Sequence, residues 1–290
     1  MQIYVSADAG RNGDGTKQRP FRHIQDAALC ARPGDEVIVA PGIYREYVDP
    51  ACAGTPEKRI TYRSEVPRKA VITGAEPVKC WENTEGTVWK ASIPNALFGT
   101  YNPYQTEIFG DWYFAAEPLH TGEVYLNGKS MYETMTLEGV LHPQVYQSSW
   151  DPDFTVYKWY TQQDPDRDCT VIYANFHGID PNEACVEINV RENCFYPSKE
   201  GIGYITLSGF TVRQAATQWA PPTAYQEGMI GPHWSKGWII EDCEVSESKC
   251  SGISLGKYLQ PNNDNKWYRH YLKDGTQTER DAICQAQNEG

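Results

Sequence analysis

The sequence lacks the features that mark membrane-spanning and secreted proteins. No run of apolar residues approaches the roughly 20 that a membrane-spanning helix needs, and the mean hydropathy is −0.60. The N-terminus, residues 1–6, shows neither a basic patch nor an apolar stretch, so no secretory signal is visible there. The sequence therefore argues against an integral membrane protein and predicts a cytoplasmic location.

Basic residues are too few to predict a partner rich in phosphate. There are 26 Lys and Arg against 38 Asp and Glu, which gives a formal net charge of −12. Binding of nucleic acid needs clustered Lys and Arg, and a polyanionic substrate such as pectate would meet like charge. An acidic chain suits a neutral substrate better. We therefore expect neither a nucleic-acid partner nor a membrane partner.

The cysteines form no pattern typical of a disulfide framework or a zinc site. Their number, nine, is odd, and no two of them form a CxxC pair, although Cys243 and Cys250 are near neighbours. This pattern favours reduced thiols. Asp8, Asn12 and Asp14 lie near glycines but do not follow the spacing of a calcium-binding EF-hand loop, and we interpret them as turn formers. The sequence predicts no metal and no cofactor.

The first 50 residues combine one amphipathic helix with short strands. A strand is predicted at 3–6, and apolar residues then recur at helical spacing over 21–31, before a Pro-Gly-Asp turn. Further short strands are predicted at 37–40 and 47–48. One helix followed by stacked short strands is typical of the capped end of a solenoid, whose first rung has no neighbour on one side.

A repeat of short strands returns after about residue 199. Its apolar positions Ile205, Leu207, Phe210 and Val212 are matched 33 residues later by Trp238, Ile240, Cys243 and Val245. The two copies are separated by a long loop, 214–235, and earlier short strands are predicted at 59–64 and 70–73. Repetition of strand, bend and strand predicts an all-β chain that folds as a parallel β-helix.

Residues 77–198 follow a different pattern. Their β-rich segments alternate with Pro, Gly, Asp and Asn, without a helical pattern, and Asn127-Gly128 is a hairpin signal. These features predict a small β-sandwich inserted into the β-helix. We therefore divide the chain into a cap with the first rungs (1–76), the insertion (77–198) and a continuation of the β-helix (199–290). Because no second cap is recognisable, we expect the continuation to be truncated.

Several motifs resemble a known family. The opening pattern, with Gly15-Thr16, Pro20-Phe21 and Pro41-Gly42, resembles that of many β-helix proteins that act on carbohydrates. More specific are Phe109-Gly110-Asp111-Trp112, Gly122-Glu123-Val124-Tyr125-Leu126-Asn127-Gly128, Ile172-Tyr173-Ala174-Asn175-Phe176, Trp219-Ala220-Pro221-Pro222 and Ile230-Gly231-Pro232-His233-Trp234. Together these motifs, spread from the cap to about Lys257, are similar to those of β-xylosidases of glycoside hydrolase family 120.

This resemblance implies both an architecture and an activity. The family folds as a right-handed parallel β-helix of the pectin lyase type with an inserted immunoglobulin-like domain. Its members are retaining, exo-acting β-xylosidases that act on small xylo-oligosaccharides through a nucleophilic Asp and an acid/base Glu. By resemblance, both carboxylates are expected on later rungs, C-terminal to Gly290, so the 290-residue chain alone is predicted to be inactive.

Five residues are candidates for contact with the substrate. The resemblance suggests that Trp112 stacks on a sugar ring and that Asp111 accepts a hydrogen bond from a sugar hydroxyl. Trp219, His233 and Trp234 lie in the loop between two rungs, where solenoids often build their binding clefts. For each of them, a purely structural role is the alternative.

Other interpretations stay open at this point. Glu241 and Asp242 are adjacent carboxylates, but neighbours in a strand point to opposite faces, so we interpret them as a solvated turn. The same scaffold could belong to a polysaccharide lyase, or to a carbohydrate-binding protein without catalysis. The sequence does not distinguish xylose from arabinose as the sugar, and it leaves open whether the protein is a homo-oligomer.

Overall fold

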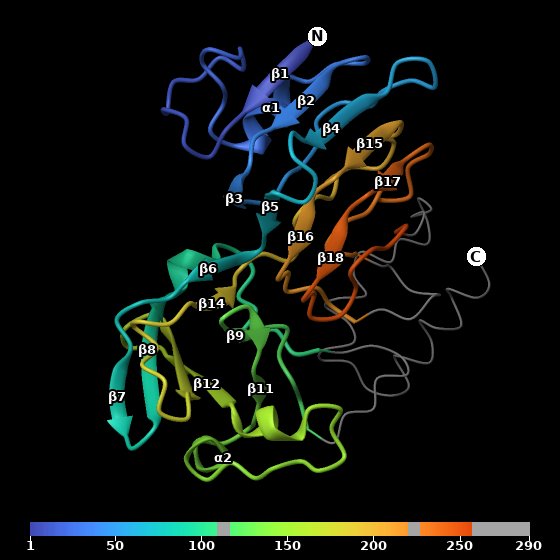
Figure 1. Cartoon of the computed structure of the whole chain (residues 1–290). Coiled ribbons are helices and arrows are strands. Elements are labelled where there is room, and N and C mark those ends of the chain that lie inside the picture. Colours follow the sequence, from blue (N-terminus) through green and yellow to red (C-terminus); the bar gives the residue numbers. More distant parts are fainter. Residues whose placement is uncertain (109–116, 220–226, 257–290) are drawn as a thin grey trace, which may run out of the picture. The chain divides into compact units, whose positions relative to one another are not determined.

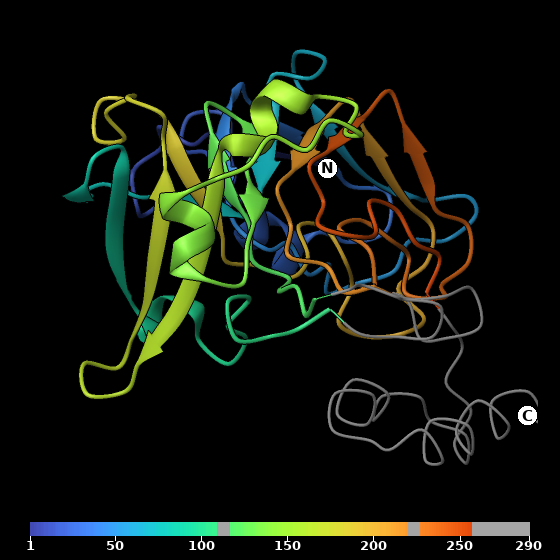
Figure 2. The same cartoon turned by 90° about the horizontal axis from the view of Figure 1, so that it is seen from below.

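The computed structural model describes residues 1–108, 117–219 and 227–256, and these fall into two compact units (Figures 1 and 2). The first unit contains residues 1–74 and the described residues from 192 onward, and the second contains the described residues of 75–191. Nearly all the regular structure is strand. The all-β class predicted from the sequence is therefore confirmed.

The first unit is built on two ladders of parallel strands. One ladder has the order β1 (Gln2–Val5), β2 (Glu36–Val39), β4 (Ile60–Ser64), β15 (Ile205–Ser208) and β17 (Ile239–Glu241). The other has the order β3 (Gly42–Arg45), β5 (Ala70–Thr73), β16 (Thr211–Arg213) and β18 (Glu244–Ser246). Figure 1 shows the strands of each ladder side by side in chain order, from blue to orange.

A row of isolated parallel bridges accompanies the two ladders. It joins Val48 to Phe195, Phe195 to Ile230, and Ile230 to Ile253. Each turn of the chain thus visits the first ladder, the second ladder and this bridge row in the same order, which makes the unit β-helix-like. The repeat of 33 residues read from the sequence is confirmed, because Leu207 pairs with Ile240 and Val212 with Val245.

The core of the first unit consists of apolar side chains stacked in register. Val37, Tyr62 and Leu207 pair along the first ladder, and all three are fully buried. The ring of Tyr62 meets that of Phe195 edge to face at 5.0 Å, which joins the ladder to the bridge row. Burial of such a side chain contributes about 1.5–3 kcal/mol, so this stack is a main source of the unit's stability.

The capping helix α1 (Ile24–Cys30) buries Ile24, Ala27 and Ala28 against this core. It begins three residues later than the sequence predicted. Phe21 is instead paired with Val5, and its N–H donates to the carbonyl of Tyr4, so the chain is still extended at that point. The shorter helix is a consequence of this pairing at the edge of the first ladder.

A buried carboxylate ties α1 to the first rung. Glu46, which follows β3, accepts hydrogen bonds from the N–H groups of Ile24 and Gln25 at 3.0 and 2.9 Å. These N–H groups lie in the first turn of the helix and have no partner within it. Burial nevertheless raises the pKa of the Glu46 carboxyl, because the charged form loses its hydration.

Glu46→Gln tests this anchor through its pH dependence. Because the folded-state pKa is raised, the stability that wild type holds over the variant is expected to be greatest below the ordinary value of 4.5 and to decline as pH rises above it. Thermal unfolding of both proteins as a function of pH measures the difference. Glu65→Gln, at an exposed site, controls for general charge effects. A difference that grows with pH would contradict the argument.

The second unit contains two mainly antiparallel sheets. One sheet has the order β11 (Tyr132–Glu133), β12 (Lys158–Asp164), β13 (Cys169–Asn175), β8 (Val88–Pro94) and β7 (Glu82–Glu85). The other has the order β10 (Lys129–Ser130), β9 (Val124–Leu126), β14 (Val186–Asn189) and β6 (Ala75–Pro77). Residues of both sheets share one core, in which Trp159, Leu126 and Ile188 are buried.

The connections of the second unit match one sequence prediction and differ from another. Asn127 and Gly128 both have positive φ and join β9 to β10, as the hairpin signal predicted. The sequence showed no helical pattern here, but the unit contains a five-residue helix, α2 (Leu137–Leu141). The side chain of Thr136 accepts a hydrogen bond from the N–H of Gly139, so a local cap starts a helix too short to leave a periodic pattern. Two 3₁₀ turns, η1 (Asn95–Phe98) and η2 (Pro152–Val156), complete the unit.

Candidate functional site

The loop that leaves the second ladder after β16 is anchored at both ends. At its start, Gln214 is fully buried with a φ of 63°, and its side-chain oxygen accepts a 2.8 Å hydrogen bond from the hydroxyl of Thr73. At its other end, the carbonyl of Gly228 accepts a 2.8 Å bond from the side chain of Asn193. The first unit therefore fixes the positions at which this long loop leaves and rejoins the rungs.

Thr217 connects the same loop to the next rung. Its buried hydroxyl accepts hydrogen bonds from the N–H groups of Cys250 (3.0 Å) and Ser251 (2.9 Å), and it is bonded to the hydroxyl of Ser248 at 2.8 Å. Trp219 follows two residues later, is partly buried, and donates its backbone N–H to the side chain of Gln218. The hydroxyl of Thr217 thus holds the chain close to the point at which Trp219 emerges.

His233 lies beyond the bridge row, on the turn toward β17. Its ring is buried, and its Nδ1 lies 2.8 Å from the carbonyl oxygen of Pro197. A carbonyl can only accept, so Nδ1 carries a proton, and in the neutral ring Nε2 is the acceptor. The ring also packs against that of Tyr196, with 5.4 Å between centroids. His233 is therefore oriented by its neighbours, which suits either a structural or a binding role.

Trp234, the next residue, exposes half of its side chain. Both His233 and Trp234 have left-handed backbone conformations, with φ of 47° and 61°, and the N–H of Trp234 donates to the carbonyl of Leu255. A left-handed conformation is costly for bulky residues and is retained only where the surroundings enforce it. Gly256 forms part of these surroundings, because a Cβ there would lie 2.9 Å from the Trp234 nitrogen. The turn holds the indole at the surface.

The predicted candidates are thus only partly brought together. His233 and Trp234 share one turn after the bridge at Ile230, whereas Trp219 precedes that bridge along the coil. Asp111 and Trp112 lie outside the described residues, and their predicted roles stay predictions. Glu241 ends β17, and Asp242 follows it at a bend with a φ of 53°; both are exposed.

A second polar cluster, in the other unit, was not anticipated from the sequence. Glu133 on β11 accepts two hydrogen bonds from His120, one from its backbone N–H at 2.9 Å and one from ring Nδ1 at 2.5 Å. Its carboxylate is almost fully buried, whereas the imidazole reaches the surface. The neighbouring Lys158 lies over the ring of Tyr132, and burial lowers the pKa of its amino group.

No sequence signal could have found the His120–Glu133 pair. The two residues are 13 positions apart, and the β9–β10 hairpin lies between them. They meet only because His120 bridges Glu107 while β11 pairs with β12. A carboxylate that binds Nδ1 fixes the tautomer of the ring and so prepares Nε2 as an acceptor.

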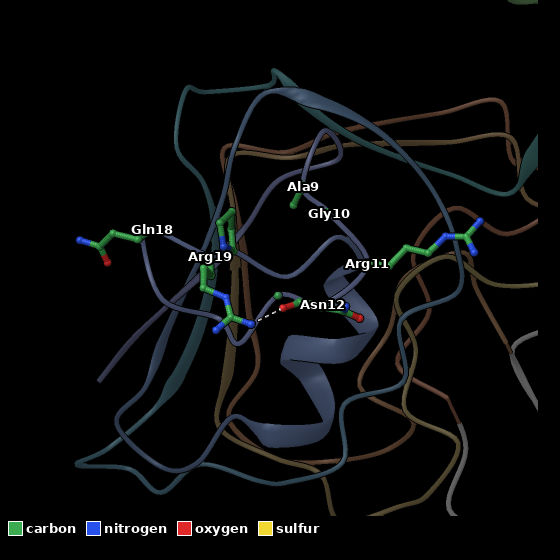
Figure 3. A pocket seen from close by; sticks show the side chains of 8 residues that line it. Ala9, Gly10, Arg11, Asn12, Gln18 and Arg19 are labelled. Carbon is green, nitrogen blue, oxygen red and sulfur yellow. Dashed lines mark hydrogen bonds between the residues drawn. The ribbon is translucent and has the colours of Figure 1, made fainter.

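The cap loop borders an open pocket of about 430 Å³, which Figure 3 shows from close by. It is lined by residues 9–13 and 18–20, and Arg19 crosses it to donate a 2.8 Å hydrogen bond to the carbonyl of Asn12. The side chains of Arg11 and Gln18 point away from each other. Asp14 accepts two hydrogen bonds from Thr16, which lower the pKa of its carboxyl and make it part of a turn. Because no two carboxylates face each other across this pocket, we propose no catalytic role for it.

Two features are absent from the described residues. Within 1–108, 117–219 and 227–256, no group of three His, Cys, Asp or Glu side chains is arranged to hold a metal ion. In the same part of the chain, the structure contains no helix with the length and apolar character needed to cross a membrane.

Comparison with known proteins supports the family resemblance. Residues 78–188 match the family model described as glycoside hydrolase 120, insertion domain. The present chain is similar along 100% of its length to the solved complex of XylC with xylose. The sequence identity is 42%, and the TM-score is 0.88. The insertion domain of glycoside hydrolase family 120 is thus present at residues 78–188. The family resemblance seen in the motifs is thereby confirmed.

The chain covers only part of the length of the proteins that it resembles. It spans 47% of the length of XylC. The uncharacterized protein YwoF of Bacillus subtilis (strain 168) is 36% identical over 72 residues, which are 25% of this chain and 15% of YwoF. The matched insertion domain lies within the second unit, so the family signature includes the strands that hold the His120–Glu133 pair.

Thr217→Val tests how the loop after β16 is held. The variant keeps the shape of the side chain but leaves the N–H groups of Cys250 and Ser251 without their acceptor, which should cost about 1–3 kcal/mol of stability. Hydrogen exchange should become faster at these two amides. Thr100→Val, at an exposed site, is the control. Unchanged exchange at both amides would show that Thr217 does not hold the loop.

Proposed function

We propose that the protein carrying this chain is a retaining, exo-acting β-xylosidase that releases xylose from small xylo-oligosaccharides. The observation that carries this proposal is the similarity to XylC, a protein solved with xylose, over the whole of the present chain. The net charge of −12 agrees with a neutral sugar as substrate. We place the enzyme in the cytoplasm, where it would act on imported oligosaccharides.

We further propose that the first unit is part of a right-handed parallel β-helix, formed by 1–76 and 199–290, and that 77–198 form an immunoglobulin-like sandwich. The parallel ladders and the bridge row support the first assignment, and the core shared by two sheets supports the second. The inward apolar residues of the last described rung are less buried than their equivalents one rung earlier, as expected if a further rung covers them. Trp238, Ile240, Cys243 and Val245 are only partly buried, whereas Ile205, Leu207, Phe210 and Val212 are fully buried.

The proposed reaction is a double displacement. A retaining glycosidase needs two carboxyl groups about 5–5.5 Å apart, one that attacks the anomeric carbon and one that protonates the leaving oxygen. Water then attacks the glycosyl-enzyme, with the second carboxylate as base. We place the nucleophilic Asp and the acid/base Glu on rungs beyond Gly290. Glu241 and Asp242 are not this pair, because successive residues around a bend do not face one another.

The residues of this chain would then bind and orient the sugar. We propose that Trp112 offers a flat face to a xylose ring and that Asp111 accepts a hydrogen bond from one of its hydroxyls. Trp234 exposes half of its indole, and Nε2 of His233 is an acceptor in the neutral ring. Trp219 emerges close to the anchor at Thr217 and is the fifth candidate.

A chromogenic aryl β-xyloside tests the proposed activity. The intact protein is expected to hydrolyse it and to release β-xylose first, which NMR of the fresh product detects. The 290-residue chain alone is expected to be inactive. Robust turnover by that chain would refute the placement of the catalytic pair, and an unsaturated product would indicate a lyase. Binding of xylose by the intact protein without turnover would indicate a binding protein.

Trp112→Ala tests the proposed stacking. Loss of an aromatic face should raise KM by about tenfold and change kcat less, because the contact is made in the ground state as well as in the transition state. Trp112→Phe, which keeps a flat ring, should recover most of the affinity. Equal kinetics for the alanine variant and wild type would remove Trp112 from the site.

A further inference from the structure

The segment between α2 and η2 in the second unit exposes two aromatic side chains. Tyr146 is 63% exposed and Trp150 is 87% exposed, and Trp150 is the most exposed large apolar side chain in the described part of the chain. The lime-coloured segment beside α2 in Figures 1 and 2 carries both residues. Single exposed apolar residues are common, but two large aromatic ones on one short segment often mark a binding surface.

Hydrogen bonds hold the backbone of this segment in place. The N–H of Tyr146 donates to the buried hydroxyl of Thr155 at 2.9 Å. The hydroxyl of Ser149 is bonded to that of Tyr132 on β11 and accepts from the N–H of Asp151, both at 3.2 Å. Because the segment is tied to a strand and to η2, the two aromatic rings are presented from a fixed backbone.

Lys129 links Trp150 to a row of further rings. The β9–β10 hairpin places its amino group 5.7 Å from the centre of the Trp150 ring and 3.9 Å from that of Phe154. Phe154 in turn stacks on Tyr157 at 4.4 Å. Lys129 also pairs with Asp151, so this local charge is balanced. A cation against one face of the indole steadies the ring and leaves its opposite face to the solvent.

The chemistry of this surface fits a neutral sugar chain. A β-linked pyranose has flat C–H faces bordered by hydroxyls, so it needs aromatic faces together with uncharged hydrogen-bonding groups. Between the two aromatic residues lie only Gln147, Ser148 and Ser149, and Gln144 precedes Tyr146. A protein partner would instead favour an apolar centre that excludes water. Val145 is the one exposed aliphatic residue between His142 and Trp150.

We propose that Tyr146 and Trp150 form an auxiliary carbohydrate-binding surface that takes a neutral β-1,4-linked pyranose chain, such as a long xylo-oligosaccharide. The surface holds the chain without cleaving it. Its function is to retain the longer xylo-oligosaccharides at the protein, and xylan is the polymeric probe for this binding. This inference goes beyond the proposed hydrolysis, because binding to the polymer requires no turnover.

Depletion of the intact protein by insoluble xylan tests this surface. Trp150→Ala is expected to lower the association constant about tenfold, because one stacked ring is lost. The double variant Tyr146→Ala/Trp150→Ala should bind less still, and Trp150→Tyr should stay near wild type. Because the surface is uncharged overall, added salt should change binding little. Leu97→Ala, at an exposed apolar site in the same unit, is the matched control and should bind like wild type.

Thermal unfolding and sedimentation of each variant separate a lost surface from a lost fold. Variants that unfold at the wild-type temperature and bind xylan less support the proposal. Wild-type binding by Trp150→Ala overturns it, as does an equal loss in Leu97→Ala. A change of oligomeric state in Trp150→Ala with unchanged xylan binding also overturns it, because the surface would then contact a second copy. Stronger binding to polygalacturonate than to xylan would exclude the neutral chain.

Discussion

The first unit depends on one constraint, that side chains on successive rungs stay in register in the core. Tyr62 and Leu207 are direct neighbours on the first ladder although 145 positions separate them in sequence. Val212 lies between Ile72 and Val245 on the second ladder in the same way. Residues 75–191 can be inserted between β5 and the bridge at Phe195 only because both flanking rungs keep one register. A slip by a single residue would turn the buried side chains outward.

The bends between the two ladders keep the rungs in register because equivalent bends share one backbone conformation. Arg68, Gly209 and Asp242 occupy equivalent bends and all have positive φ, from 53° to 72°. They are also joined along the stack, because the N–H of Arg68 donates to the carbonyl of Gly209 and that of Gly209 to Glu241. Only glycine adopts this conformation without cost. At Arg68 and Asp242 the conformational cost is offset by the free energy gained when the in-register side chains are buried in the core.

The same geometry explains what could be predicted from the sequence. The repeat of 33 residues was visible because every inward position holds an apolar residue. A turn at Glu241-Asp242 was predicted, but the left-handed conformation of Arg68 was not visible, because arginine does not favour that conformation. The start of α1 was also predicted too early, since the pairing of Phe21 with Val5 is a tertiary contact that periodicity does not reveal. Local patterns thus predicted the repeated elements, whereas contacts between distant residues determined their boundaries.

The candidate sites show the same division. His233 and Trp234 were recognisable because a long loop between repeated strands is conspicuous in a sequence. The His120–Glu133 pair was not, because its members meet only through the pairing of β11 with β12 and the bridge at Glu107. Both histidines have Nδ1 bound to an oxygen acceptor, a backbone carbonyl in one case and a buried carboxylate in the other. Orientation of an imidazole is therefore a tertiary property, and a histidine in the sequence predicts only that it can occur.

Aromatic residues show how far composition alone can lead. With nine Trp and 19 Tyr, the chain suggests both sugar binding and a large core, and the sequence does not separate the two uses. The structure separates them by burial. Trp159 is enclosed in the core of the second unit and donates its indole N–H to Glu123, so its polar atom is satisfied inside the protein. Trp150 has its ring in water on a hydrogen-bonded segment. Core packing cannot account for that position, and a ligand with flat apolar faces can.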